Sequence, residues 1–149
     1  GGQVYTVSYL VHPELRFVLM SPDFPLSTHA ARSVLPQSLP FKTAVGQLSR
    51  LAILPKAMEL GDEALISLCL RDALHQPYRF PLIHESGKLR QLAHGLGCDA
   101  FCISGAGPTL LCLTRDGSLA AGLKEAAQGL EHSWDIRELA VDHQGARCI

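Results

Sequence analysis

The sequence predicts an α+β domain in which an antiparallel sheet carries helices on one face. Two apolar runs, residues 100–103 and 110–113, flank a short glycine loop at 104–109 and are typical of buried strands joined by a turn. Other segments are rich in the β-branched and aromatic residues that favour strands. The predicted strands are residues 4–11, 17–20, 100–103, 110–113 and 134–141. Because helical patterns fill the long stretch between the second and third strands, this order favours helices packed against an antiparallel sheet.

Apolar residues recur with helical spacing in the segments between the strands. Phe41, Val45, Leu48 and Ala52, for example, stand at i, i+4, i+7 and i+11. Pro55 should kink or end this helix. The predicted helices are residues 28–35, 41–55, 62–74, 86–97 and 118–130, with N-caps at Ser27 or Thr28, at Asp62 and at Ser86.

The segment of residues 75–81 contains two prolines, one on each side of Tyr78 and Arg79. Prolines restrict the residues before them to extended conformations, so we expect this segment to be extended and rigid. A rigid segment that presents an arginine suits ligand recognition. A structural linker is the alternative interpretation.

The composition fits one domain that spans residues 1–149. The chain is 47% hydrophobic and 18% charged, with a formal net charge of -1, which is enough apolar material for a single core. The near-neutral balance, without a basic stripe, argues against a nucleic-acid partner. No apolar run approaches the roughly 18 residues of a membrane helix, and the first residues lack the basic region of a signal peptide. We therefore expect neither a nucleic acid nor a membrane as partner.

The cysteines and histidines predict no metal site. Five cysteines occur without a CxxC pair, and the seven histidines form no HxxxH or HExxH pattern. Free buried thiols in a reducing compartment fit this distribution best, which predicts a cytoplasmic protein. The cysteines are Cys69, Cys98, Cys102, Cys112 and Cys148.

The glycine loop is the main candidate for a ligand-binding element. Gly105 and Gly107 permit positive φ and carry no side chain, so another group can approach the backbone closely. Successive N–H groups can then converge on an anion, beside the hydroxyl groups of Ser104 and Thr109. The alternative is a hairpin turn with a purely structural role.

Three separate segments together resemble one family. PDFPLSTHAAR, residues 22–32, resembles the PDF-LST-EAR segment of homoserine kinases, and HQPYRFPLI, residues 75–83, resembles their HEPYR-PLI segment. ISGAGPTLLCL, residues 103–113, resembles the third signature motif of the wider GHMP kinase superfamily, which includes galactokinase and mevalonate kinase. The helix at 44–52 and the closing DHQGAR, residues 142–147, also fit the family's order. The resemblance covers almost the whole chain.

The resemblance implies a ferredoxin-like α+β fold and the transfer of the ATP γ-phosphate to the hydroxyl of L-homoserine, in threonine biosynthesis. It also implies that the chain is only the C-terminal half of such an enzyme. The phosphate loop of the family, its adenine pocket and its magnesium carboxylate lie in an amino-terminal half, and no matching loop occurs here. Gly1-Gly2 resembles the glycine pair that opens the C-terminal half in the family. We therefore expect ATP and Mg²⁺ to be bound mainly by the absent half, with the isolated chain inactive.

The same resemblance assigns a substrate site. Arg32 and Arg79 match the two family arginines that clamp the substrate carboxylate, a task suited to the guanidinium fork. The remaining residues that match the pocket lining are Thr28, Ser104, Gly105 and Gly107. Phosphoryl transfer needs mainly positioning and charge neutralisation, so no catalytic base is assigned in this chain. The expected partners are L-homoserine, the amino-terminal half and, as a further option, a second copy of the chain in a homodimer.

Other functions are compatible with parts of this pattern. Another kinase of the superfamily, acting on mevalonate-like or sugar acceptors, would share the glycine loop but not the LST and PYR segments. A non-catalytic amino-acid-binding α+β module would bind its ligand without an upstream half. Arg32, taken alone, could be an ordinary solvated surface arginine. Exposed apolar surface on the chain would instead indicate a missing partner half or a dimer.

Overall fold

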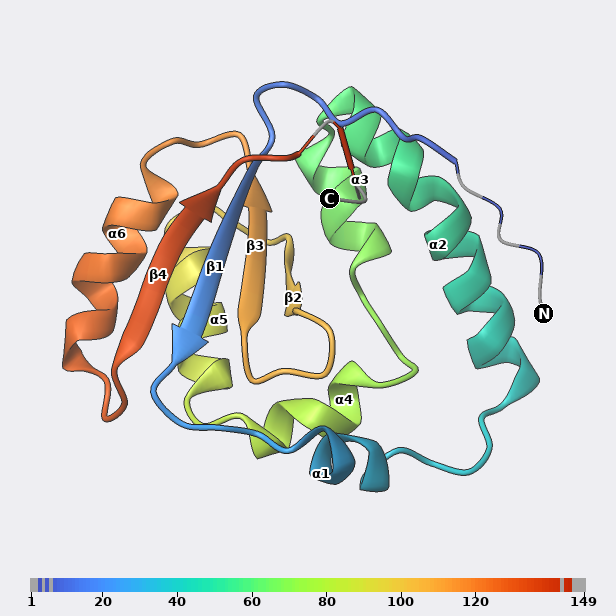
Figure 1. Ribbon diagram of the computed structural model, residues 1–149, viewed down its shortest axis with the longest axis horizontal. Coiled ribbons are helices and arrows are strands. Elements are labelled where there is room, and N and C mark those ends of the chain that lie inside the picture. The colour runs from blue at the N-terminus through green and yellow to red at the C-terminus, as the bar shows by residue number, and fades with distance from the viewer. Residues whose placement is uncertain (1–2, 4, 6, 143, 146–149) are drawn as a thin grey trace.

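The computed structural model describes residues 3, 5, 7–142, 144 and 145, and it contains one antiparallel sheet of four strands in the order β2-β3-β1-β4 (Figure 1). The central strand β1 pairs with β3 on one side, with Val18 opposite Cys112, and with β4 on the other. The α+β class and the antiparallel sheet predicted from the sequence are confirmed. The strands are β1 Arg16–Pro22, β2 Phe101–Ile103, β3 Leu110–Thr114 and β4 Trp134–Leu139.

The expected strand over residues 4–11 is wrong for the described part of that segment. Gln3, Tyr5 and residues 7–11 are not in a strand, while Val4 and Thr6 lie outside the described residues. No strand of the sheet pairs with this segment, so its β-prone side chains have no ladder to join. The glycine pair at 1–2 and parts of the closing DHQGAR segment also lie outside the described residues.

The helices differ in how they relate to the sheet. α5 and α6 pack on one face and bury the larger core with Val18, Met20 and Leu110. At one end of the opposite face, α3 and the last turns of α2 cover a smaller cluster around Leu113 and Ile66. None of the described helices has the length and apolar character to cross a membrane. The helices are α1 Thr28–Ser33, α2 Phe41–Leu60, α3 Glu63–Cys69, α4 Gln76–Arg79, α5 Ser86–Gly95 and α6 Leu119–Ala126, with 3₁₀ turns η1 Phe80–Leu82 and η2 Ala127–Gly129.

α2 stands apart from the sheet, and α3 lies between the two (Figure 1). The helix does not end at Pro55 but continues to Leu60, where Gly61 adopts the left-handed conformation with φ of 64°. Its predicted apolar stripe does not face the core: Phe41 is 85% exposed and Leu48 is 65% exposed. The periodicity correctly predicts a helix, but no described segment covers the side chains of its apolar stripe.

The expectation that residues 75–81 are extended is wrong, because Gln76–Arg79 form a helical turn and Phe80–Leu82 a 3₁₀ turn. Pro77 lies in the first turn of α4, where a missing N–H costs no helical hydrogen bond. The Asp72 carboxylate accepts hydrogen bonds from the backbone N–H groups of residues 74–76 and so nucleates this turn. The local carboxylate thus outweighs the extended preference around the prolines.

Two of the predicted N-caps are confirmed and one is wrong. Ser27 accepts from the N–H groups of residues 29 and 30, and Asp62 accepts from Leu65 N–H at 2.9 Å. Ser86 does not cap α5; instead its hydroxyl donates to the Phe80 carbonyl. The residue before α5 is Glu85, which has a φ of 59°. This left-handed conformation is uncommon for a residue with a side chain, so other contacts must hold it.

Those contacts are made by the Glu85 carboxylate, whose side chain is 6% exposed. It accepts hydrogen bonds from the backbone N–H groups of Glu131 and His132, at 2.8 and 3.1 Å, and from the Trp134 indole N–H. Burial alone would raise the pKa of Glu85, but these donors and the Lys88 ammonium lower that pKa to about 2. The carboxylate therefore ties the start of α5 to the start of β4.

Glu85→Gln should lower the free energy of unfolding at neutral pH by about 1.5–3 kcal/mol, the range for hydrogen bonds to a charged group. The folded pKa of about 2 lies below the ordinary value of 4.5. The stabilisation is therefore complete above the ordinary value and is lost as the pH falls toward the folded value. Denaturant unfolding at neutral and acid pH should show this loss in the parent chain and not in the variant. The control is Glu125→Gln, on the exposed side of α6. Equal free energies of unfolding for Glu85→Gln and the parent chain at neutral pH would contradict the role of the Glu85 carboxylate.

Candidate functional site

Arg79 is the point at which the three segments of the predicted site meet. Its Nε–H donates to the Ala31 carbonyl of α1 at 2.9 Å, and its Nη1 donates to the Gly105 carbonyl of the glycine loop at 3.3 Å. The side chain is part-buried. Segments that are 48 and 26 residues away in sequence are thus joined by one guanidinium. Its Nη2 group donates to no acceptor in the part of the chain that the structure describes, so two N–H donors remain for a ligand.

His75 supports Arg79 from one turn earlier. Its Nδ1 lies 3.2 Å from Arg79 Nη1, and an arginine can only donate, so Nδ1 is the acceptor. Burial lowers the pKa of His75, the Asp72 carboxylate opposes this effect, and the positive charge of Arg79 lowers the pKa further. A lowered pKa keeps the imidazole neutral at neutral pH. The neutral ring is the form that can accept from Arg79.

The glycine loop closes on itself through backbone hydrogen bonds. Ser104 N–H donates to the Thr109 carbonyl at 2.9 Å, and Gly107 N–H donates to the Ser104 carbonyl at 3.1 Å. These two N–H groups are therefore not available to an anion, in contrast to the sequence-based expectation that successive N–H groups converge. The N–H groups of Gly105 and Ala106 have no acceptor among the described residues. They are the donors that the loop can offer to a ligand.

The two glycines of this loop differ in why glycine is needed at each position. Gly105 and Gly107 have φ of 62° and 85°, both in the left-handed region. A Cβ on Gly107 would lie 3.0 Å from Ile83 Cδ1, whereas a Cβ on Gly105 would meet nothing within 4 Å. Gly107 is thus needed for packing as well as for conformation. Gly105 is needed for its conformation alone, and its carbonyl accepts from Arg79.

Arg32 and Thr28 both lie on α1 and are both exposed. Arg32 directly follows Ala31, whose carbonyl accepts from Arg79, so the two arginines sit on segments in direct contact. The Arg32 guanidinium forms no hydrogen bond or ion pair with any described residue. Thr28 is the first residue of α1 and follows the capping residue, Ser27. The structure thus brings Arg79, Ala31 and Gly105 together, and it leaves Arg32 and Thr28 on the exposed surface of the same helix.

Sequence reasoning missed the residues that hold Arg79 in place. Gln76 is 5% exposed; its Oε1 accepts from Ile103 N–H of β2 at 2.8 Å, and its Nε2 donates to the Leu70 carbonyl at 3.0 Å. Asp72 caps α4, and its pKa is lowered because these backbone N–H bonds outweigh its burial. One local signal was present: an aspartate side chain commonly accepts hydrogen bonds from the backbone N–H groups that follow it in a turn, as Asp72 does here. The contact between Gln76 and β2 had no local signal.

Within the described ranges, no group of three or more His, Cys, Asp or Glu side chains is placed to hold a metal ion. The one carboxylate close to Arg79 is that of Asp72, which already accepts backbone N–H groups of the α4 turn, and the free donors of Arg79 suit an anionic ligand. No magnesium ligand is assigned to this part of the chain.

The chain is similar to homoserine kinases along most of its length. The GHMP kinases C terminal family model matches residues 52–130, which is more than half of the chain. A homoserine kinase from Crocosphaera subtropica is 40% identical over 138 residues, which cover 91% of this chain and 45% of that protein. One from Caldicellulosiruptor saccharolyticus is 35% identical over 149 residues, covering 97% of this chain and 48% of that protein. The chain thus spans about half the length of the curated relatives that it matches.

Solved structures share the fold over a similar span. A homoserine kinase from Cytophaga hutchinsonii superposes with a TM-score of 0.84 at 24% identity, covering 93% of this chain and 45% of that one. The mevalonate kinase of L. major gives a TM-score of 0.63 at 13% identity, covering 85% of this chain and 41% of that one. At these identities the likeness concerns the fold, and it agrees with the ferredoxin-like arrangement expected from the sequence. With the family model matched over more than half its length, this chain belongs to the family of GHMP kinase C-terminal domains.

Proposed function

We propose that the chain is the acceptor-binding half of a homoserine kinase, which transfers the γ-phosphate of ATP to the hydroxyl of L-homoserine. The observation that carries this proposal is the guanidinium of Arg79, which joins α1 to the glycine loop and keeps its Nη2 donors free. Homoserine kinases among the relatives support the choice of acceptor. The place of the reaction in threonine biosynthesis and a cytoplasmic location follow from the same assignment.

In this proposal the chain recognises the acceptor and positions it. The carboxylate of homoserine takes charge-assisted hydrogen bonds from Arg79 Nη2 and from the Arg32 guanidinium on the neighbouring helix. The N–H groups of Gly105 and Ala106 form the loop wall that faces the transferring phosphoryl group. Positioning and neutralisation of charge are the main demands of this reaction. ATP and Mg²⁺ are assigned to the amino-terminal half, and no step through the metal is placed on this chain.

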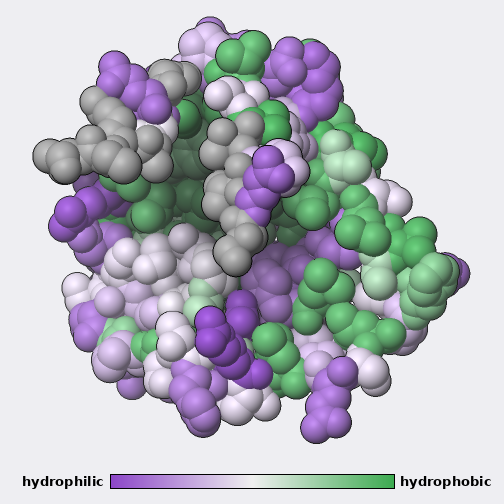
Figure 2. All heavy atoms as spheres, turned by 45° about the vertical axis from the view of Figure 1, so that its right-hand side comes forward, coloured by the Kyte–Doolittle hydropathy of each residue, from purple (hydrophilic) through white to green (hydrophobic). Residues whose placement is uncertain are grey.

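The apolar face of α2 supports a partner half. The stripe Phe41, Val45 and Leu48 and the neighbouring Leu51 are exposed, and a groove of about 540 Å³ runs between α2 and the segment of Tyr9 and Leu10. Figure 2 shows hydrophobic side chains gathered over this side of the molecule. Continuous apolar patches of this kind mark interaction surfaces in soluble proteins. Because the relatives are about twice as long as this chain, their amino-terminal half is the occupant that we assign to this face.

The activity is tested by an ADP-release assay with L-homoserine, run on this chain and on a longer polypeptide that includes the upstream coding sequence. We expect activity in the longer polypeptide and none in the chain alone. Phosphorylation of mevalonate-like or sugar acceptors in preference to homoserine would assign another kinase of the superfamily. Binding of homoserine by the chain, without turnover in either polypeptide, would assign a non-catalytic amino-acid-binding module.

Arg79→Ala in the longer polypeptide should raise the KM for homoserine by about 10- to 100-fold, which corresponds to about 1.5–3 kcal/mol for a hydrogen bond to a charged group. Arg79→Lys should not restore the parent KM, because an ammonium cannot hold Ala31, Gly105 and a carboxylate in one plane. The matched control is Arg137→Ala, an exposed arginine of β4. A KM for homoserine that is unchanged in Arg79→Ala would remove Arg79 from the acceptor site.

Leu48→Asp should weaken the association of this chain with a separately produced amino-terminal half, by at least tenfold in Kd, because it places a charge in the apolar face of α2. Sedimentation velocity or calorimetry measures the association. Leu139→Asp, at a 45% exposed position of β4, is the control. If Leu48→Asp instead abolishes self-association of the chain and leaves binding of the amino-terminal half intact, the face belongs to a homodimer.

A further inference from the structure

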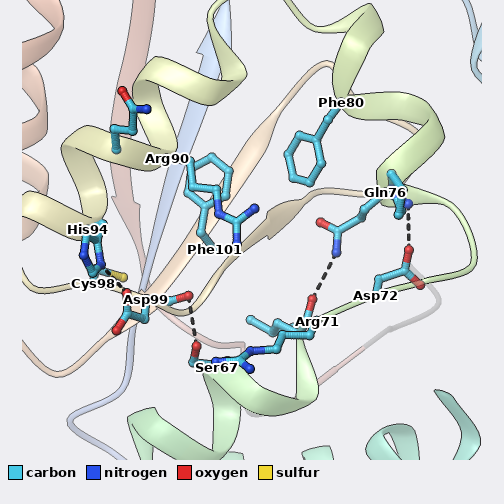
Figure 3. Close-up of a pocket in the computed structure, with 13 residues that line it drawn as sticks. Ser67, Arg71, Asp72, Gln76, Phe80, Arg90, His94, Cys98, Asp99 and Phe101 are labelled. Atoms are coloured by element: carbon cyan, nitrogen blue, oxygen red, sulfur yellow. Dashed lines mark hydrogen bonds and ion pairs between the residues drawn. The ribbon is translucent and has the colours of Figure 1, made fainter. Parts of the chain in front are cut away.

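A cavity of about 760 Å³ opens between α3, α4, α5 and the outer strand β2 (Figure 3). Its volume lies in the range of small-molecule sites, well above the size of a bare ion. Neither the two arginines assigned to the acceptor nor any residue of the glycine loop lines it. It is therefore a separate candidate site.

Two carboxylates, Asp72 and Asp99, and two guanidinium groups, Arg71 and Arg90, line this cavity, so their formal charges balance. The four groups differ in their internal partners. Asp72 is committed to the N–H groups of the α4 turn, with distances of 2.7 and 2.6 Å to residues 75 and 76. The carboxylate of Asp99 is committed to His94, with Oδ1 and Nδ1 2.5 Å apart. The guanidinium groups of Arg71 and Arg90 make no hydrogen bond or ion pair with any residue that the structure describes. The guanidinium groups are therefore the charged groups of the cavity wall that have no internal partner among the described residues.

The two arginines come from different elements. Arg71 follows α3, and Arg90 lies on α5; Figure 3 shows Arg90 extending from α5 into the space that Arg71 borders from the α3 side. Arginines on separate walls can bind one anion between them, each with paired N–H donors. Two such groups facing solvent without an acidic partner are what an anion site requires.

The wall beside the arginines is aromatic. The rings of Phe80 and Phe101 both line the cavity and are stacked, with centroids 6.1 Å apart and planes inclined by 19°. Leu70 and Pro77 add further apolar surface. Phe101 is only 7% exposed, so the accessible part of this wall is mainly Phe80, Leu70 and Pro77. An inorganic anion would leave that apolar surface uncovered, whereas a flat apolar body would bury it.

We propose that this cavity binds a small organic anion, with a phosphate or carboxylate group between Arg71 and Arg90 and a flat apolar body against Phe80 and Phe101. The site does not depend on kinase activity. Its wall includes Pro77, within α4, and Phe80, which directly follows Arg79, so a ligand here would contact the same α4 segment as the acceptor site.

Titration calorimetry of the chain with phenyl phosphate and inorganic phosphate tests this site. We expect phenyl phosphate to bind at least tenfold more tightly than inorganic phosphate, because only the former covers the aromatic wall. Benzoate is the third probe: whichever of phenyl phosphate and benzoate binds more tightly identifies the anionic group that the arginines prefer. Binding of neither at millimolar concentration would overturn the proposal.

Variants distinguish the contribution of the two arginines to binding from that of the aromatic wall. Arg90→Ala and Arg71→Ala should each weaken phenyl phosphate binding at least tenfold, while Phe80→Leu should reduce its advantage over inorganic phosphate. Arg137→Ala, on β4, is the matched arginine control and should bind as the parent chain does. Circular dichroism establishes that each variant is folded. Equal loss of binding in Arg90→Ala and Arg137→Ala, or no loss in either, would overturn the site; neither result bears on the kinase assay.

Discussion

The hydrogen bonds of the Arg79 guanidinium are the interactions on which the arrangement of the candidate site depends. One side chain satisfies the Ala31 carbonyl, the Gly105 carbonyl and the neutral His75 ring, and so fixes α1, α4 and the glycine loop relative to one another. Each of these is a short segment without a large core of its own. An arginine can do this because its five donors point in one plane, and because two of them remain after the internal contacts are made. The same group thus holds three segments together and keeps two N–H donors without an internal acceptor among the described residues.

The sequence predicted the sheet well, because its signals are local. Apolar runs bounded by turn residues located β2, β3 and most of β1 and β4, and Asp62 was correctly identified as a cap. The errors came where a contact outside the segment decided the conformation. Around Pro77 the prolines favoured an extended chain, but the Asp72 carboxylate bound three successive N–H groups and made a helical turn. Residues 7–11 had the composition of a strand and no neighbouring strand to pair with.

The candidate site was predictable in part. Arg79 and Gly105 are in contact although 26 residues separate them in sequence. The family resemblance predicted that both belong to one pocket, whereas helical or strand periodicity carries no information about such a contact. The roles of His75 and Gln76 depend on how α4 packs against the loop and β2, so no single-segment signal could have assigned them. The assignment of Arg32 and Thr28 to the acceptor stays a prediction, since both are exposed on α1. For α2 the sequence predicted the element but not its surroundings. Its apolar periodicity identified a helix, but periodicity within one helix does not say which surface, if any, packs against the apolar side chains.

The buried amide of Gln76 has a consequence for the sheet as well as for the site. β2 is an outer strand, and its unpaired backbone groups are a template on which a strand from another molecule can add. Gln76 Oε1 accepts a hydrogen bond from the Ile103 N–H, and Gln76 Nε2 donates to the Leu70 carbonyl, which fixes the position of the amide. The side chain from α4 therefore covers part of the edge of β2. Any change that frees α4 would therefore uncover a site for intermolecular strand addition. The short turn that presents Arg79 also protects the chain against polymerisation through β2.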